Sequence, residues 1–190
     1  MPEEHSVHKL DARSLRGLAH PLRMQLLRTL KHHGPATASM LAERLGESSG
    51  ATSYHLRQLA EYGFVEDVPE RGKGRERWWQ AAVQGLTFDE NLLHATDPAT
   101  RGAVDTYMHE VATNHARELS TWVATREEWL PAWSHSTDLS DWTLRLTPER
   151  ALGLIEKMQA LLASYQNEPD TTPGAETVRV HTHLFPFATD

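Results

Sequence analysis

The feature that most constrains the fold of this chain is a pair of short helical patterns joined by a glycine. The first pattern, 37–46, carries its apolar residues on one stripe and ends at Gly46, a residue that adopts positive φ without steric cost. The second pattern follows two serines, Ser48 and Ser49, either of which can cap it, and continues to about residue 62. Two helices joined by so short a turn are typical of a helix-turn-helix.

A basic hairpin follows the second helix. Residues 64–68 start a strand, residues 69–74 turn, and residues 75–81 return. The segment 71–77 carries four cations around two glycines. The glycines allow a tight turn close to a sugar-phosphate backbone, where cations release counterions. Placed directly after a helix-turn-helix, the hairpin predicts a wing and contact with DNA.

The second helix is the predicted recognition helix, which must bury one stripe and offer the opposite stripe to the major groove. Thr52, Leu56 and Leu59 are expected to face inward. Arg57 could bond guanine, but a phosphate contact is favoured, because most protein–DNA hydrogen bonds position the protein rather than specify sequence. The predicted DNA contacts are Ser49, Gly50, Ala51, Ser53, Tyr54, Arg57, Arg71, Lys73 and Arg75.

Charge is divided unevenly along the 190 residues. The formal charge is −7 overall, with +2 in residues 1–85 and −9 in residues 86–190. Such asymmetry fits one half that faces nucleic acid and one half that avoids it. The chain has no cysteine, which excludes disulfides and thiolate metal sites. The acidic N-terminus lacks the apolar core of a signal peptide, and no apolar run could span a bilayer, so a cytoplasmic protein that does not contact membranes is expected.

The whole pattern predicts a fold that is mainly α with a small β component. A winged helix-turn-helix domain is expected at 10–83, preceded by a disordered segment at 1–9, and a C-terminal helical region with a short two-stranded sheet is expected at 97–186. Trp78 and Trp79 should lie on opposite strand faces, with one of them in the core. The further helices are predicted at 10–18, 22–32, 98–129 and 148–166, and the two C-terminal strands at 142–146 and 177–185.

The segments Ala19–Leu30, Leu41–Gly46, Ser53–Leu59 and Gly63–Val65 together resemble the winged-helix core of ArsR-like bacterial repressors. The resemblance covers about residues 10–82. It implies a homodimeric, promoter-binding regulator of transcription whose DNA affinity is changed by an effector. Metal-sensing members carry cysteines in the first helix of the helix-turn-helix, and this chain has none, so thiolate sensing of arsenic, cadmium or lead is not expected.

Twelve histidines invite a metal hypothesis. His109 and His115 are six residues apart on the long helix, which turns them by about 240° to different faces and excludes a zinc-hydrolase motif. Asp105 with His109, and His115 with Glu118, remain weak metal candidates. Helix-surface pairs are the favoured interpretation, and no metal or other cofactor is predicted.

Four tryptophans gather in the acidic half of the chain. Trp122, Trp129 and Trp133, with Trp142, could line an apolar pocket for a small organic effector. Core or dimer-interface packing is the more common role of such residues. The long helix from about residue 98 is the expected dimerisation element, because one winged helix covers only one half-site.

The sequence therefore favours a DNA-binding transcriptional regulator, as a homodimer on a promoter pseudo-palindrome, and a repressor rather than an activator. The alternative is a winged-helix module that binds other proteins without DNA specificity. An enzyme is disfavoured, because no nucleophile–base pair, phosphate-binding loop or carboxylate dyad is recognisable in the sequence.

Overall fold

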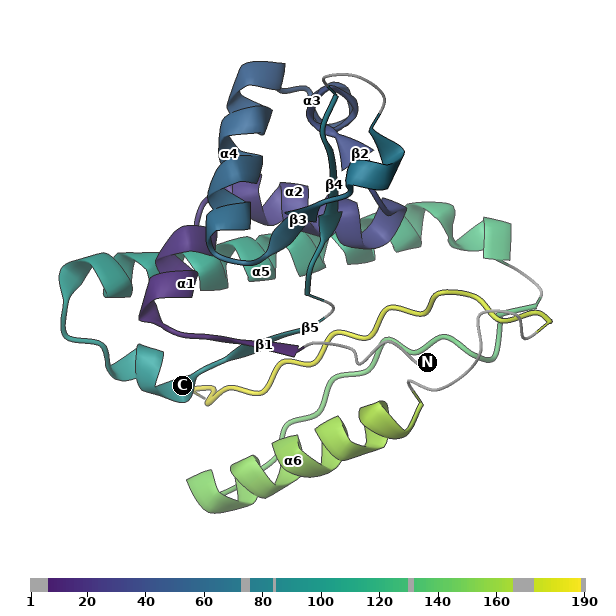
Figure 1. Ribbon diagram of the computed structural model, residues 1–190. Helices are drawn as coiled ribbons and strands as arrows, with labels where there is room; N and C mark the ends of the chain where they lie inside the picture. The colour runs from purple at the N-terminus through teal and green to yellow at the C-terminus, as the bar shows by residue number, and fades with distance from the viewer. Residues whose placement is uncertain (1–6, 73–75, 84, 130–131, 166–172, 189–190) are drawn as a thin grey trace. The chain divides into compact units, whose positions relative to one another are not determined.

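A computed structural model describes residues 7–72, 76–83, 85–129, 132–165 and 173–188. The chain divides into two compact units, Met1–Ser120 and Thr121–Asp190, with the boundary inside one long helix. The fold is mostly helical with small sheets and an N-terminal helix-turn-helix, which confirms the predicted fold class (Figure 1). The domain limits 10–83 and 97–186 stay a prediction.

The elements follow one another in a simple order. The α-helices are α1 (Ala12–Leu18), α2 (Pro21–His33), α3 (Ala38–Leu45), α4 (Ser49–Glu61), α5 (Pro98–Thr125) and α6 (Pro148–Ser164). The strands are β1 (Val7–Leu10), β2 (Ala36–Thr37), β3 (Val65–Asp67), β4 (Trp78–Ala81) and β5 (Gly85–Phe88). Short 3-10 helices are η1 (Pro69–Arg71), η2 (Glu90–His94) and η3 (Arg126–Trp129).

Local capping fixes the helix-turn-helix. The Thr37 hydroxyl accepts a hydrogen bond from the Met40 N–H at 3.3 Å and begins α3, and Gly46 ends that helix at φ 69°. The Ser48 hydroxyl accepts from the Ala51 N–H at 3.2 Å and begins α4. These caps confirm the helix limits and the glycine turn that the sequence predicts.

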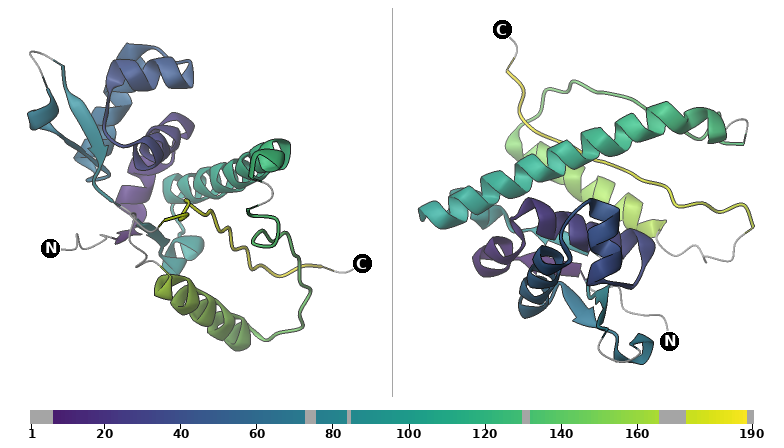
Figure 2. Two further views of the ribbon diagram at one scale, coloured as in Figure 1. Left: turned by 90° about the vertical axis from the view of Figure 1, so that its right-hand side faces the viewer. Right: turned by 90° about the horizontal axis from the view of Figure 1, so that it is seen from above.

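The wing is a three-stranded antiparallel sheet in the order β2-β4-β3, and its hairpin is visible in Figure 2. In the pairing of β2 with β4, Ala36 lies opposite Trp79. Strand β2 was not expected from the sequence, because two residues are too few to show a period. Trp79 is 5% exposed and belongs to the core, whereas Trp78 is half-buried beneath the Arg71 guanidinium, 5.9 Å from the ring centroid. One tryptophan in the core is as predicted.

The expectation that residues 7–9 are disordered is wrong. They belong to β1, which pairs in parallel with β5, so that Val7 lies opposite Gly85. Lys9 forms an ion pair with Asp89 at 3.1 Å beside this small sheet. Helix α1 consequently starts at residue 12 rather than 10, because Leu10 completes β1 and Asp11 caps the helix in a capping box with Ser14.

The first turns of α5 belong to the core of the N-terminal unit. Asp97 caps the helix by accepting from the Thr100 N–H at 2.8 Å, as its position in the sequence predicts. Thr100 is fully buried and accepts a hydrogen bond from Arg16 of α1 at 2.8 Å. Val104 is buried in the same cluster as the α1, α2 and α4 leucines. The core of the winged-helix domain therefore includes the start of α5 in addition to the earlier helices and the wing.

Within the C-terminal unit, α6 begins where predicted, with the Thr147 hydroxyl accepting from the Arg150 N–H at 3.4 Å. The predicted strands at 142–146 and 177–185 are wrong, because neither of these described segments is a strand in the structure. Alternation of apolar and polar residues favours an extended backbone but does not by itself make a strand, and Trp142 stays 83% exposed. Across the described parts of the chain, no helix combines the length and apolar character needed to cross a membrane.

Candidate nucleic-acid interface

Helix α4 has one buried face and, opposite it, one accessible face. Thr52, Leu56 and Leu59 are 0% exposed, as predicted for its inward face. On the opposite face Tyr54 is 54% exposed, and Arg57 is exposed one turn further along. Of the other predicted contacts on this helix, Ser49 and Gly50 are exposed and Ala51 and Ser53 are half-buried. The helix thus offers small and polar side chains along one accessible stripe.

The Arg57 side chain is anchored to its own helix. Its Nε donates to the Ser53 carbonyl at 3.1 Å, one turn earlier. This bond uses the inner nitrogen of the guanidinium and leaves the two terminal nitrogens as a fork. The fork can donate to a phosphate or to two neighbouring acceptors on a base edge.

The wing carries cationic side chains both before and after its turn. Arg71 is exposed at the end of η1, while Lys73 and Arg75 lie outside the described residues. Arg77, which was not predicted as a contact, forms an ion pair with Asp67 at 3.0 Å and lies 5.3 Å from the centroid of the Trp79 ring. The ion pair and the ring fix the direction of the Arg77 side chain on the wing sheet.

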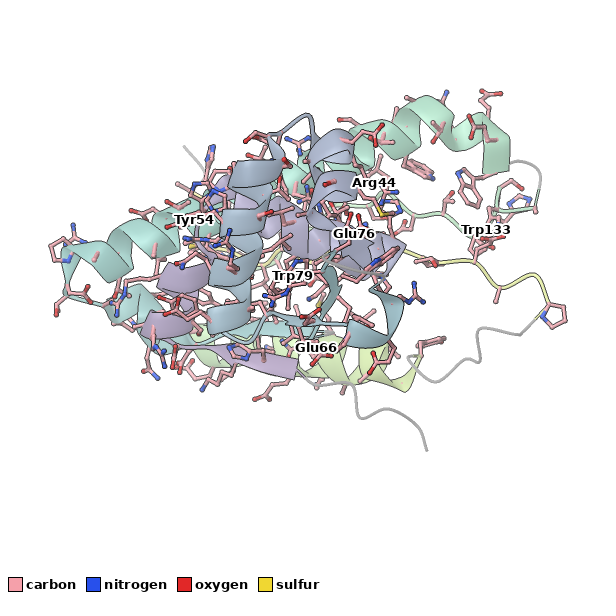
Figure 3. All side chains as sticks on the ribbon, turned by 45° about the horizontal axis from the view of Figure 1, so that its top comes forward. Arg44, Tyr54, Glu66, Glu76, Trp79 and Trp133 are labelled. Carbon is pink, nitrogen blue, oxygen red and sulfur yellow. The ribbon has the colours of Figure 1, made fainter. Side chains whose placement is uncertain are left out.

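A groove of about 330 Å³ lies between the start of α3, the middle of α4 and the wing. In Figure 3, Glu76 and Trp79 lie on the wing side of α4 and Tyr54 lies on its other side. Neither this groove nor its acidic residue was predicted from the sequence, although a carboxylate inside a run of four cations is a recognisable signal. The lining residues are Thr37, Ala38, Ser39, Ser53, Arg57, Glu76, Arg77 and Trp79.

Behind α4, a cluster of His20, His55 and Arg23 joins it to α2. The two imidazole rings lie 4.4 Å apart, and His20 Nδ1 accepts from the Leu22 N–H at 3.2 Å, which caps α2. Burial lowers the pKa of both histidines; the Arg23 charge adds to this effect at both, and the His20 charge adds to it at His55. His55 Nδ1 and Arg23 Nε are buried without a hydrogen-bond partner among the residues that the structure describes. This cluster was not predictable from sequence spacing, since its members come from two different parts of the chain.

The four weak metal candidates all lie on α5. Glu118 accepts a hydrogen bond from Asn114 at 2.9 Å, and His109 is exposed on the helix surface. Asp105 is also exposed, and His115 is half-buried. Within the described ranges, no three histidine or acidic side chains are grouped so that they could hold a metal ion.

The predicted effector residues belong to the C-terminal unit from Trp122 onward. Trp122 and Trp133 are half-buried, Trp129 is 41% exposed, and the Trp133 N–H donates to the Trp129 carbonyl at 3.2 Å. A separate hollow of about 540 Å³ in this unit is lined by Leu144, Arg145, Leu146, Thr147, Arg150, Pro186 and Phe187. The role of the tryptophans in effector binding stays a prediction.

Comparison with known proteins identifies a helix-turn-helix domain, whose family model matches residues 18–68. Among solved structures, the chain is similar to an apo C30AH42A mutant of Lactococcus lactis ZitR, at 19% identity, with 82% of this chain and 84% of that chain covered and a TM-score of 0.31. It is similar to RV1404 from Mycobacterium tuberculosis at 17% identity, with 83% and 82% covered and a TM-score of 0.32. For apo wild-type MarR from E. coli the identity is 18%, the coverage 63% and 88%, and the TM-score 0.32.

No curated protein matches the chain. The similarities to the solved structures are distant and say nothing about what this chain binds. The matched domain extends from the end of α1 through α2, α3 and α4 into the wing. This domain supports a DNA-binding regulator of transcription.

Proposed function

We propose that this protein is a sequence-specific transcriptional regulator, and that it represses from a pseudo-palindromic promoter site as a homodimer. The observation that carries the proposal is the accessible face of α4. Its N-terminus is capped and lined by small residues, and a groove with two arginines separates it from the wing. A helix presented in this way can enter the major groove while the wing contacts the backbone.

The dimer is proposed from the length and surface of α5. Only Thr100, Ala103 and Val104 of this 28-residue helix are buried. Further along, Met108 is 51% exposed and Leu119 is 41% exposed. A second copy that covers this side of α5 would bury these side chains and bring two α4 helices to two half-sites, one or more helical turns apart.

An organic effector is part of the proposal. Its support is the concentration of tryptophans at 122–133, since aromatic side chains line most sites for small organic molecules. A ligand that binds there should change the tryptophan emission of the protein and, at the same concentration, its affinity for promoter DNA. An emission change without a change in DNA affinity would separate binding from regulation and contradict the effector role.

The first experiment measures the affinity of the full chain for DNA from its own upstream region and for random DNA of equal length, at several salt concentrations. We expect selective binding to the upstream DNA and a steep loss of affinity with salt, because phosphate contacts release counterions. Arg57→Glu should abolish the binding. Lys157→Glu makes the same charge change on the exposed face of α6 and should leave it nearly unchanged.

Equal affinity for upstream and random DNA at every salt concentration would contradict the proposal. If Arg57→Glu then left the protein's cellular role intact, the winged helix would be a protein-binding module. Circular dichroism of both variants checks that the charge change has not unfolded α4.

A further inference from the structure

We propose that the groove between α3, α4 and the wing reads one G·C base pair, with Arg57 donating to the guanine and Glu76 accepting from the cytosine. This inference rests on the proposed function, because it names the base pair that the same interface would recognise. It replaces the sequence-based preference for a phosphate contact by Arg57.

The two side chains reach the groove from different elements. Arg57 comes from the recognition helix and Glu76 from the wing, two residues before β4, and both line the same hollow of about 330 Å³. Ser53, on the turn of α4 before Arg57, also lines the hollow, and its carbonyl accepts a hydrogen bond from the Arg57 Nε. The groove therefore combines a donor fork and a carboxylate acceptor on the face that approaches DNA.

Among the described residues, Arg57 and Glu76 form no ion pair with each other or with Arg77. Among the ion pairs of the described residues, none includes Arg57 or Glu76. Arg77 also lines the groove, but it forms an ion pair with Asp67 across the wing and lies over the Trp79 ring. The Glu76 side chain is exposed, and its carboxylate has no ion-pair partner among the described residues, so it can accept a hydrogen bond from a ligand in the groove.

The chemistry of the major groove selects the base pair. Guanine presents two adjacent acceptors, N7 and O6, which match the Arg57 fork, and the paired cytosine presents its N4 amino donor beside them. Across the major-groove edge of a base pair, the order of two acceptors followed by one donor occurs only at G·C. At A·T the central group is a donor, which opposes the arginine, and thymine presents an acceptor and a methyl group, which oppose the carboxylate.

A backbone role for Glu76 is disfavoured by its charge. A carboxylate close to a phosphate is repelled, so an acidic residue in a wing with four cations lowers the affinity for DNA in general. The repulsion is offset only where the carboxylate meets a donor. In the major groove such donors are the amino groups of cytosine and adenine, and the fork of Arg57 restricts the choice to cytosine.

The experiment selects binding sequences for the full chain from a random DNA library. We then measure the affinity for the selected site and for all its single base-pair changes. One position should require G·C, and changing it should weaken binding by about 5- to 150-fold, the range of a good base contact. Glu76→Ala and Arg57→Lys should each remove most of that preference at the same base pair. Glu70→Ala is the matched control, since it removes the same charge from exposed η1, outside the groove.

Both glutamate variants should bind random DNA more tightly than the wild type, but only Glu76→Ala should lose the base-pair preference. The inference is overturned if Glu76→Ala keeps every wild-type preference, or if Glu76→Ala and Arg57→Lys act at different base pairs. If the wild type enriches no sequence at all, the proposed function fails and this inference falls with it. A selected site that is unchanged by Glu76→Ala overturns the inference alone.

Discussion

Gly17 lies against the ring of Tyr62, and Gly17→Ala should therefore destabilise the N-terminal unit. A Cβ at position 17 would lie 2.7 Å from Tyr62 Cδ1 and closer still to Cγ and Cδ2, where ordinary contacts begin at 3.4 Å. The base of the ring would have to move, not a flexible tip. Tyr62 is the C-cap residue of α4, so the movement would reach the end of the recognition helix.

Two effects of opposite sign set the magnitude. An extra methyl group in a packed site costs about 1–3 kcal/mol of unfolding free energy. Alanine in a helix interior is more favourable than glycine by roughly 0.5–1 kcal/mol. The net expectation is a loss of about 1–2 kcal/mol, since the steric cost exceeds the gain in helix propensity.

Urea denaturation of the full chain measures the change in unfolding free energy. Gly102→Ala is the matched control, because Gly102 lies in α5 with nothing within 4 Å of the added Cβ. We expect it to stabilise the protein by roughly 0.5–1 kcal/mol. Tyr62→Leu should relieve the penalty of Gly17→Ala in the double variant. If Gly17→Ala stabilises the protein as Gly102→Ala does, the steric reasoning is refuted.

Three further predictions concern the interior behind α4. Leu59→Ala, at a fully buried position, should lower the unfolding free energy by about 2–5 kcal/mol in urea denaturation, and a loss below 1 kcal/mol would contradict the packing. Thr52→Val should raise it by up to about 1 kcal/mol, because the buried Thr52 hydroxyl has no hydrogen-bond partner among the described residues; a decrease would reveal a bond to it. Burial lowers the pKa of His20 and His55 below 6.5 in the folded protein. As the pH falls, these histidines are therefore protonated in the unfolded chain before they are protonated in the folded one. Their contribution to the unfolding free energy is present above pH 6.5 and is lost on acidification. Thermal unfolding between pH 7.5 and 5 should show this loss of stability. The double variant His20→Asn, His55→Gln keeps a capping side chain at position 20 and should lose less stability over the same pH range. An equally steep loss in the double variant would show that other groups cause it.

The sequence predicted the elements whose signals are local. The caps Thr37, Ser48 and Thr147 and the left-handed Gly46 each act within four residues, so the starts of α3, α4 and α6 and the end of α3 follow from short stretches of the chain. The buried stripe of α4 was also predictable, because helical periodicity determines it.

The elements that depend on distant partners could not be predicted in this way. Strand β1 exists because it meets β5, and neither four-residue segment alternates clearly by itself. The segment 177–185 shows the opposite error, since it alternates but is not a strand. The His20–His55 contact and the groove beside Glu76 were missed for the same reason, because each joins residues from different elements.

The parallel pairing of β1 with β5 has a consequence for the order of folding. Because Val7 lies opposite Gly85, the pairing closes a chain loop of roughly eighty residues, and its entropic cost must be met before any of its hydrogen bonds form. The two helices of the helix-turn-helix, α3 and α4, are neighbours in the chain, so their contact closes a much shorter loop and can form earlier. The amide hydrogens of β1 should therefore exchange with solvent deuterium sooner than those of α4, and their protection would report when the whole N-terminal unit is closed.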